Sequence, residues 1–384
     1  MTSPHVFIVA VENSADQLGA ALITALRAKK PQLGFQAIGG SAIEACGVKS
    51  QFNIGGLSIL GFSEAIRAYP LVLKRVKETV AAILNSQAKV AVLIDSWGFM
   101  IRVAQRLKRA GYQGTIVKYV APQVWAMREG RAKVLAQSVD HLLTIHNFDA
   151  PYFEQHGLRT THIGNPMFDA DFDSGNEQRL RAHLGLSKDQ KVCAVLFGSR
   201  QSELSQLRRP ITDAVNSLEA LFPEMAFVSP ISETLRGQIM TSVAASDMEN
   251  IHLLEEKWKF DVFAAAEVAI ACSGTVTTQL ACAGIPAVVV YKVKPLTWWA
   301  GKKLYKPDYI SLVNISAGKA LMPELLQDTA NGQGIALALR TYIDDPHVRL
   351  QTSRALLAEA QIMRGEGGSA SDSAAEKILE LINA

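Results

Sequence analysis

Cysteine, aromatic residues and excess charge are all scarce in this sequence. Its 384 residues include four cysteines, and the aromatic residues make up 7%. The 39 Lys and Arg nearly balance the 36 Asp and Glu, which leaves a net charge of +3. This balance excludes a strongly basic nucleic-acid binder on bulk electrostatics. The cysteines show no metal-ligand spacing, which predicts reduced core residues in a reducing compartment; they are Cys46, Cys193, Cys272 and Cys282.

Long apolar runs are missing as well. No stretch approaches the roughly 20 apolar residues that are needed to span a bilayer. The run Val6–Val11 is too short for the apolar part of a signal peptide, and no basic segment precedes it. We therefore expect a cytoplasmic protein in which any membrane contact is peripheral.

Short β-branched runs alternate with amphipathic segments along most of the chain. Hydrophobic residues make up 48% and charged residues 20%, and the length suits two domains of about 150–200 residues. The alternation predicts α/β domains with parallel sheets covered on both faces. The expected strands are Val6–Val11, Phe35–Ile38, Val90–Asp95, Thr115–Val120 and His141–Ile145, followed by Val192–Phe197, Ala226–Val228, Ile251–Leu254, Val268–Cys272 and Ala287–Tyr291.

The alternation weakens between Pro166 and Gly185, where turn residues and charges gather. This segment is the candidate domain boundary. Two doubly wound halves place the expected ligand sites at the carboxyl ends of the strands. From about Ile335 to the end we expect helices.

Three polar or Gly-rich loops leave a strand and enter a helix. Free backbone N–H groups and the helix dipole favour phosphate at such places. None matches a Walker motif or G-x-G-x-x-G, which disfavours a P-loop NTPase or an NAD enzyme. Each loop could instead be a helix N-cap, with Asn13 or Ser14 as the capping residue of the first. The loops contain Glu12, Asn13, Ser14 and Asp16; Gly198, Ser199 and Arg200; and Ser273, Gly274, Thr275 and Gln279.

Asp95 ends a strongly apolar strand and precedes Ser96-Trp97-Gly98. A carboxylate at this strand end suits a general base that faces the ligand site. It equally suits an N-cap for the helix that follows. His141, His146 and His162 lack ligand spacing, so no metal site is predicted.

Several longer motifs give the sequence a resemblance to a known family. The chain resembles lipid-A-disaccharide synthases, bacterial glycosyltransferases with the GT-B fold, over nearly its whole length. The two most specific segments are Pro122-Gln123-Val124-Trp125-Ala126 and Ser311-Leu312-Val313-Asn314. The others are Glu12–Asp16, Ile38–Gly40, Leu60–Glu64, Leu93–Asp95, Ile163–Pro166, Gly198–Arg200 and Ser273–Thr275.

The resemblance implies an inverting transfer that needs no metal or cofactor. A 2,3-diacylglucosamine unit moves from its UDP-activated form to 2,3-diacylglucosamine 1-phosphate, which gives a β(1→6)-linked disaccharide 1-phosphate and UDP. It implies that Asp95 is the base and that Arg200 lies beside the diphosphate. It further implies a donor site at Ser199, Ser273, Gly274, Thr275, Gln279 and Asn314, and an acceptor or diphosphate loop at Glu12, Asn13, Ser14 and Asp16.

On this basis we expect an acceptor domain at 1–166 and a UDP-sugar domain at 167–345, with helices at 346–384 that pack back on the first domain. The resemblance also implies peripheral association with the inner face of the inner membrane. Two segments that mix apolar residues with cations, Leu57–Val76 and Lys292–Lys306, are candidates for that contact. No nucleic-acid partner is expected, and a homo-oligomer is compatible with these features.

The sequence departs from the family pattern at several motif positions. Val11 and Ala15 replace two glycines, Asn165 replaces a histidine, and Gln279 replaces a glutamate. Two alternatives therefore stay open. One is a GT-B enzyme with another acceptor, or a UDP-sugar epimerase; the other is a catalytically silent paralogue that binds nucleotide sugars. The remaining departures are Gly98, Met100 and Phe197.

Overall fold

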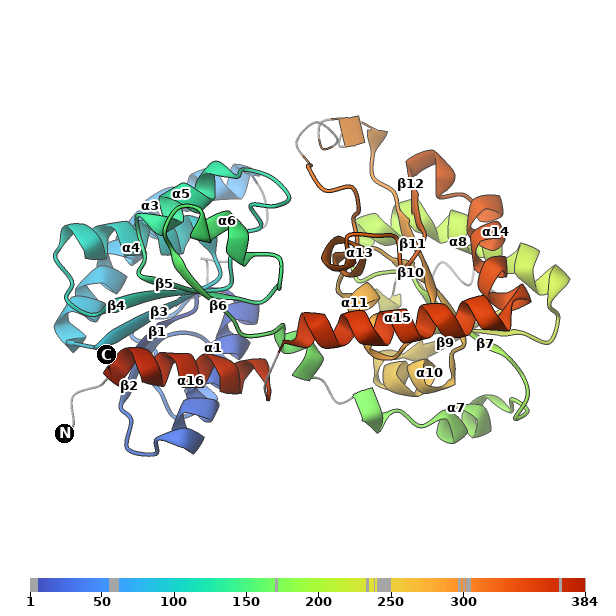
Figure 1. The fold of residues 1–384 in the computed structure, drawn as a ribbon, viewed down its shortest axis with the longest axis horizontal. Coiled ribbons are helices and arrows are strands. Elements are labelled where there is room, and N and C mark those ends of the chain that lie inside the picture. The colour runs from blue at the N-terminus through green and yellow to red at the C-terminus, as the bar shows by residue number, and fades with distance from the viewer. Residues whose placement is uncertain are drawn as a thin grey trace. The chain divides into compact units, whose positions relative to one another are not determined.

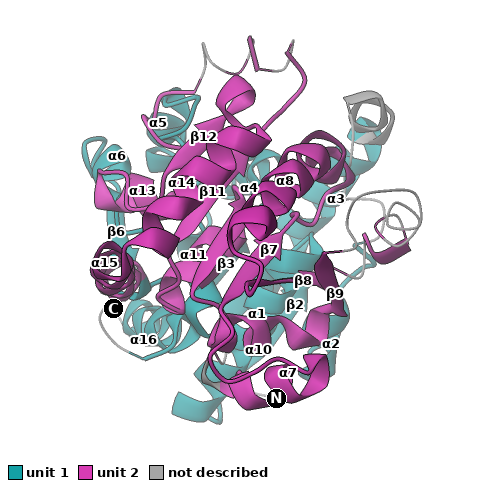
Figure 2. Ribbon diagram, turned by 90° about the vertical axis from the view of Figure 1, so that its right-hand side faces the viewer, with its two compact units in different colours: residues 1–169, 364–384 teal, residues 170–363 magenta. Residues whose placement is uncertain are grey.

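The chain folds into two compact α/β units, which Figure 2 colours separately. Unit 1 comprises residues 1–169 and 364–384, and unit 2 comprises residues 170–363. The computed structural model describes residues 6–54, 62–169, 172–232, 235–237, 239, 250–295, 298–299, 301, 305–365 and 368–383, without the side chains of 62–68 and 173.

In unit 1, the described residues form a sheet of six parallel strands in the order β2-β1-β3-β4-β5-β6 (Figure 1). The strands are β1 (Val6–Val9), β2 (Phe35–Ile38), β3 (Val90–Ile94), β4 (Thr115–Tyr119), β5 (His141–Thr144) and β6 (Arg159–His162). The helices are α1 (Asn13–Lys29), α2 (Ser41–Ala45), α3 (Phe62–Ser86), α4 (Trp97–Arg109), α5 (Gly130–Ala136), α6 (Ala150–Glu154) and α16 (Ala370–Asn383), with the 3-10 turn η1 (Pro166–Asp169).

Alternate residues of these strands enter two different apolar layers, because successive side chains of a strand point to opposite faces. Phe7 and Val9 belong to the layer that contains residues of α4 and α5. Val6 and Ile8 belong to the layer that contains residues of α1 and α16. Each face of the sheet is therefore covered, as the continuous apolar runs predicted.

In unit 2, the strand order among the described residues is β12-β11-β10-β7-β8-β9, again all parallel. The strands are β7 (Val192–Leu196), β8 (Ala226–Ile231), β9 (Ile251–Glu255), β10 (Val268–Cys272), β11 (Ala287–Tyr291) and β12 (Glu324–Leu326). The helices are α7 (Glu177–Leu184), α8 (Gln201–Leu221), α10 (Lys259–Ala265), α11 (Thr275–Cys282), α13 (Leu312–Ala317), α14 (Gly332–Asp344) and α15 (Pro346–Arg364), with 3-10 turns η2 (Phe172–Ser174), η3 (Glu256–Trp258) and η4 (Gln327–Thr329).

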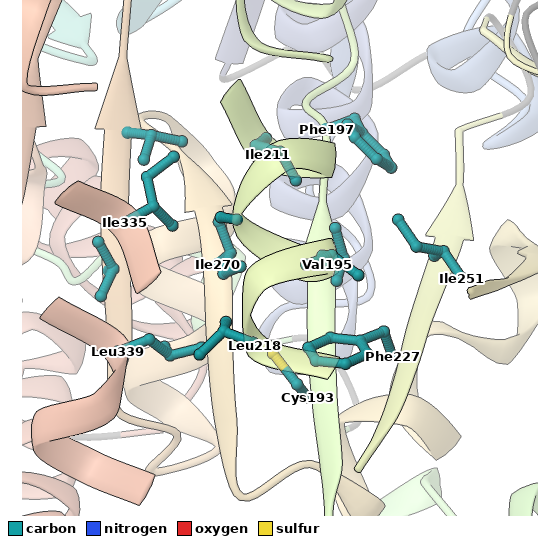
Figure 3. Close-up of a cluster of buried hydrophobic side chains, with 14 of the residues drawn as sticks. Cys193, Val195, Phe197, Ile211, Leu218, Phe227, Ile251, Ile270, Ile335 and Leu339 are labelled. Carbon is teal, nitrogen blue, oxygen red and sulfur yellow. The ribbon is translucent and has the colours of Figure 1, made fainter. Parts of the chain in front are cut away.

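A large apolar cluster lies between this sheet and helices α8 and α14 (Figure 3). Cys193 and Val195 of β7 contact it from the sheet, and Ile211 and Leu339 contact it from the two helices. Cys193 and Cys272 are buried, whereas Cys46 and Cys282 are half-buried. The expectation of core residues therefore holds for Cys193 and Cys272 and is wrong for the other two.

Every strand expected from the sequence is present, and β6 and β12 were not expected. Both are edge strands, and β6 has the sequence Arg-Thr-Thr-His with none of its residues buried. The two helices after residue 345 belong to different units: α15 lies almost wholly in unit 2, and α16 lies in unit 1. Unit 1 ends its first segment at Asp169, three residues beyond the expected boundary.

Candidate active site

The loop after β1 places several polar groups at the carboxyl end of the unit 1 sheet. Glu12 is the N-cap residue of α1, although its side chain does not cap the helix. Its carboxylate instead accepts a hydrogen bond from the Ser96 hydroxyl, which follows β3. Asn13 and Ser14 are exposed at the start of α1. Because β1 and β3 are neighbours, the loop after β1 and the loop that contains Asp95 lie next to each other at the carboxyl end of the sheet.

Asp16 lies in the first turn of α1, and its side chain binds the start of α2. It is 4% exposed, and its carboxylate accepts N–H bonds from Gly40 at 2.7 Å, Ala42 at 2.8 Å and Ile43 at 3.3 Å. These N–H groups open α2, so Asp16 satisfies the orphan donors of that helix. The side chain fixes the β2–α2 connection, and the geometry gives no support to a direct ligand contact.

Asp95 and Ser96 form a strained turn between β3 and α4. Their φ angles are +49° and +40°, in the left-handed region that few non-glycine residues adopt. The Asp95 N–H donates to the Tyr119 carbonyl at 2.9 Å, which ties the turn to β4. The N-cap residue of α4 is Ser96, without a side-chain cap.

The Asp95 carboxylate is half-buried and has no hydrogen bond or ion pair within the described part of the chain. It does not cap α4, so the reading of Asp95 as a capping residue loses its support. An unpaired carboxylate held by a strained turn is the pattern expected of a reactive group, since such strain gathers at functional sites.

Lys118, near the end of β4, is a residue that the sequence analysis missed. It is 2% exposed, and its Nζ donates to the Asp95 carbonyl at 2.7 Å and to the Tyr119 carbonyl at 3.0 Å. Burial lowers the pKa of Lys118 to about 7, and the charges of Asp95 and Glu12 act in the opposite direction. The only signal in the sequence is a cation within an otherwise apolar strand.

The Pro122–Ala126 motif builds the core beside these loops. Trp125 is buried and packs edge-on against Phe148, with ring centroids 5.3 Å apart, and against His146 at 6.3 Å. Burial lowers the pKa of His146 to about 4 and raises that of Asp149 to about 8. Burial therefore disfavours the charged form of both side chains.

In unit 2, the loop between β7 and α8 is bonded to one of the chain's own carboxylates, Glu203, in a capping box at the start of α8. Gly198 has φ +90°, and the N–H groups of Ser199 and Arg200 donate to Glu203 Oε2 at 3.2 and 3.3 Å. Arg200 Nη1 lies 2.8 Å from Glu203 Oε1, and the arginine side chain is 75% exposed. Two backbone donors and a guanidinium thus converge on one carboxylate, as they would on a phosphate.

The second loop of unit 2 follows β10, the neighbour of β7 in the sheet. Ser273 is half-buried, and Gly274 and Thr275 are exposed at the start of α11. Gln279, one turn further, has a buried side-chain oxygen with no hydrogen-bond partner in the described residues. Because β7 and β10 are adjacent, the loop of Ser199 and Arg200 and the loop of Ser273–Thr275 lie next to each other at the carboxyl end of the unit 2 sheet.

Asn314 was expected to contact the donor nucleotide, but its side chain is fully hydrogen-bonded within the protein. Its Nδ2 donates to Met322 O at 2.7 Å and to Glu324 Oε1 at 2.9 Å, and its Oδ1 accepts from the N–H groups of Leu321 and Met322. Glu324 also accepts bonds from Ser311. Asn314 is 0% exposed, so its amide stabilises this loop and has no donor left for a nucleotide.

The described residues offer neither a metal site nor a membrane span. No group of three or more His, Cys, Asp or Glu in them is arranged to hold a metal ion. No helix that the structure describes is both long and apolar enough to cross a membrane.

Comparison with known proteins identifies the family. A family model described as lipid-A-disaccharide synthetase matches residues 6–378. Proteins named lipid-A-disaccharide synthase from Rhodospirillum centenum and Paramagnetospirillum magneticum are each 35% identical to this chain. The first match covers 98% of this chain and 94% of the relative, and the second covers 98% and 97%. The chain belongs to the lipid-A-disaccharide synthetase family.

Solved structures share the fold of this family member at low sequence identity. The S. aureus MnaA-UDP co-structure covers 99% of this chain and 96% of its own, with a TM-score of 0.63 and 14% identity. The glycotransferase of kitacinnamycin covers 99% and 100%, with a TM-score of 0.63 and 16% identity. These matches, together with the two parallel sheets, confirm the expected GT-B fold.

The departures from the lipid-A-disaccharide synthase pattern fall mostly in the core. Val11, Ala15 and Met100 are buried members of the apolar clusters. Asn165 is buried and its Oδ1 accepts the Met167 N–H at 3.0 Å. These side chains therefore satisfy local packing and turn geometry. Of the departures named here, Gln279 alone carries an unsatisfied polar atom.

Proposed function

We propose that this family member catalyses the lipid-A-disaccharide synthase reaction. A 2,3-diacylglucosamine unit passes from its UDP-activated form to O6 of 2,3-diacylglucosamine 1-phosphate, which yields the β(1→6) disaccharide 1-phosphate and UDP. The observation that carries this proposal within the family is the Asp95 carboxylate on its strained turn, which has no hydrogen bond or ion pair among the described residues. The family match over residues 6–378 supports the substrate class.

Asp95 is the proposed general base. It accepts the proton of the acceptor 6-hydroxyl while the oxygen attacks the anomeric carbon of the donor. The bond from that carbon to the UDP oxygen breaks on the opposite face, and UDP leaves with the electron pair, so the configuration inverts. A carboxylate without an internal hydrogen bond is free to take this proton, and such assistance accelerates reactions by roughly 10²–10⁴-fold.

Arg200 is the proposed partner of the leaving diphosphate. Its side chain is 75% exposed and pairs with Glu203, which is 15% exposed and also accepts hydrogen bonds from the N–H groups of Ser199 and Arg200. A diphosphate carries more charge than a carboxylate, and in this proposal it displaces Glu203 from these donors. The N–H groups of Ser199 and Arg200 become available to the same phosphate, and charge that builds on it during bond breaking is stabilised.

The donor's nucleotide is proposed to bind beside this loop. Ser273, Gly274 and Thr275 present exposed groups at the start of α11, and Gln279 Oε1 is without a partner in the described structure. The structures of S. aureus MnaA with UDP and of Neisseria meningitidis UDP-GlcNAc 2-epimerase with UDP-GlcNAc have the same fold with such ligands bound.

The decisive experiment is mass spectrometry of the products. The purified chain is incubated with UDP-2,3-diacylglucosamine and 2,3-diacylglucosamine 1-phosphate, and Asp95→Asn serves as the control. The expected products are the disaccharide 1-phosphate and UDP in equal amounts. UDP binding without a disaccharide would favour a silent paralogue, whereas UDP release with only a different acceptor would favour another transferase.

Peripheral contact with the inner face of the inner membrane is a second part of the proposal. In Leu57–Val76, residues 57–61 and the side chains of 62–68 lie outside the described structure. The part that follows exposes Tyr69 and Leu71 beside Lys74 on α3. Trp299 in the other segment is also exposed. Apolar residues beside cations suit an anionic lipid surface.

Vesicle binding tests this contact. Tyr69→Ser with Leu71→Ser should weaken salt-sensitive binding to vesicles that contain anionic phospholipid, without a lower melting temperature. Leu221→Ser, at an exposed apolar residue of unit 2, is the matched control and should bind as the parent chain does. Equal binding of all three proteins would refute the role of α3.

A further inference from the structure

The hydrogen bonds of Lys118 end on the loop that carries Asp95. Its Nζ lies 2.7 Å from the Asp95 carbonyl oxygen and 3.0 Å from that of Tyr119. The Asp95 N–H donates to the same Tyr119 carbonyl at 2.9 Å. The amine therefore fastens the backbone of the turn on both sides, at β3 and at β4.

This position is costly for a lysine. Lys118 is 2% exposed, and strand alternation places it on the face of Ile116, within an apolar layer. Burying an ammonium group is expensive even when its N–H groups are bonded. An apolar side chain at this position would pack without that cost, so the fold alone does not explain the lysine.

The turn that Lys118 holds is itself strained. Asp95 and Ser96 have left-handed φ angles, and so does Val120, immediately after β4. Such conformations persist only where the surroundings determine them fully. The Ser96 hydroxyl is held by Glu12, and the Asp95 carbonyl is held by Lys118. Both ends of the turn are thus anchored by side chains, while no described residue makes a hydrogen bond or ion pair with the Asp95 carboxylate.

We propose that Lys118 is a positioning residue for Asp95, which it holds in the conformation that presents the carboxylate to the acceptor hydroxyl. This proposal rests on the role of Asp95 proposed above. The charged groups that face the amine are Asp95 after β3 and Glu12 after β1. Burial lowers the pKa of Lys118 to about 7, because the charged amine loses its solvation by water.

A double-mutant cycle tests this coupling. The initial rate of UDP release is measured with both acylated substrates for the parent chain, Lys118→Met, Asp95→Asn and the double variant. Lys118→Met should lower kcat by roughly 10- to 100-fold, the loss typical of a small misplacement of a reacting group, with KM within about twofold. In the Asp95→Asn background the same substitution should change kcat by less than about twofold, because the group it positions is no longer a base.

Lys89→Met is the matched control. Lys89 precedes β3, at the opposite end of the strand from Asp95, and donates to the Ile382 carbonyl. Its loss should leave kcat unchanged. Lys118→Gln, whose amide nitrogen is one bond closer to the backbone and cannot reach both carbonyl oxygens, repeats the test if the methionine variant does not fold.

The outcomes separate the two proposals. An equal fall in kcat in both backgrounds, or a kcat for Lys118→Met within about twofold of the parent, would overturn the positioning role. A normal kcat for Asp95→Asn would instead overturn the role of Asp95 as the base, and it would do so without reference to Lys118.

Discussion

Replacing Lys118 by methionine should change how the stability of unit 1 depends on pH. Between pH 7 and 10.5 the unfolded chain holds a proton on Lys118 that the folded chain has released, because burial lowers the pKa from 10.5 to about 7. The unfolded state then binds more protons, so the free energy of unfolding rises with pH in this window. Below about pH 7 the folded chain carries the full cost of a buried ammonium group.

The size of the effect follows from the same values. At about 1.4 kcal/mol per pH unit, the span from 10.5 to about 7 corresponds to about 5 kcal/mol. This is comparable to the whole stability of many domains, which is about 5–15 kcal/mol. Between pH 7 and 9 the parent chain should gain about 2 kcal/mol relative to Lys118→Met.

Urea unfolding at pH 7, 8 and 9 measures this difference. Hydrogen-exchange mass spectrometry of peptides from β3 and β4 follows unit 1 separately from unit 2. Lys118→Met should be the more stable protein at pH 7 and should lose its advantage as the pH rises, while Lys89→Met should parallel the parent. Parallel curves for the parent and Lys118→Met would show that Lys118 keeps its ordinary pKa, and the burial argument would be wrong.

Four further substitutions test the proposed site. Asp95→Asn should lower turnover by roughly 10²–10⁴-fold while UDP affinity, measured by calorimetry, persists; near-normal turnover would remove the base. Arg200→Ala should lower kcat more than it weakens donor binding, because leaving-group charge is largest in the transition state; a change in KM alone would indicate uniform binding. Glu203→Gln should tighten UDP binding by up to about fivefold, since it removes the carboxylate charge that competes for the exposed Arg200 guanidinium; unchanged affinity would mean that UDP does not displace this carboxylate. Asn314→Ala should lower the free energy of unfolding of unit 2 by about 3 kcal/mol, because it leaves several buried groups unsatisfied; an unchanged melting temperature with lost UDP binding would restore Asn314 as a ligand contact.

The strand positions were predictable because buried parallel strands are continuous apolar runs. Val90–Ile94 and Val268–Cys272 are clear examples, each buried throughout. Edge strands escape this signal: Arg159–His162 is polar, and Glu324–Leu326 has three half-buried residues. Their pairing comes from the neighbouring strand, which a local pattern does not reveal.

The sequence indicated which polar residues lie at the strand ends, but it did not indicate which groups they bind. Asp16 and Asn314 look alike in the sequence, as polar residues beside a helix start. Their partners, Gly40 and Glu324, lie 24 and 10 residues away, and only the folded chain brings them together. Lys118 and Glu203 were missed for the same reason, since a lone charge has no periodicity and its meaning depends on what it contacts.

The separation of unit 1 into two chain segments has a consequence during synthesis. Strands β1 to β6 leave the ribosome first, but the layer beside α1 lacks Ala374, Ala375, Ile378 and Ile382 until the last helix, α16, emerges. Until then nascent unit 1 exposes an apolar face, while all of unit 2 is translated. A chain that is cut before α16 therefore loses part of the core of unit 1, the unit made first, and keeps unit 2 whole.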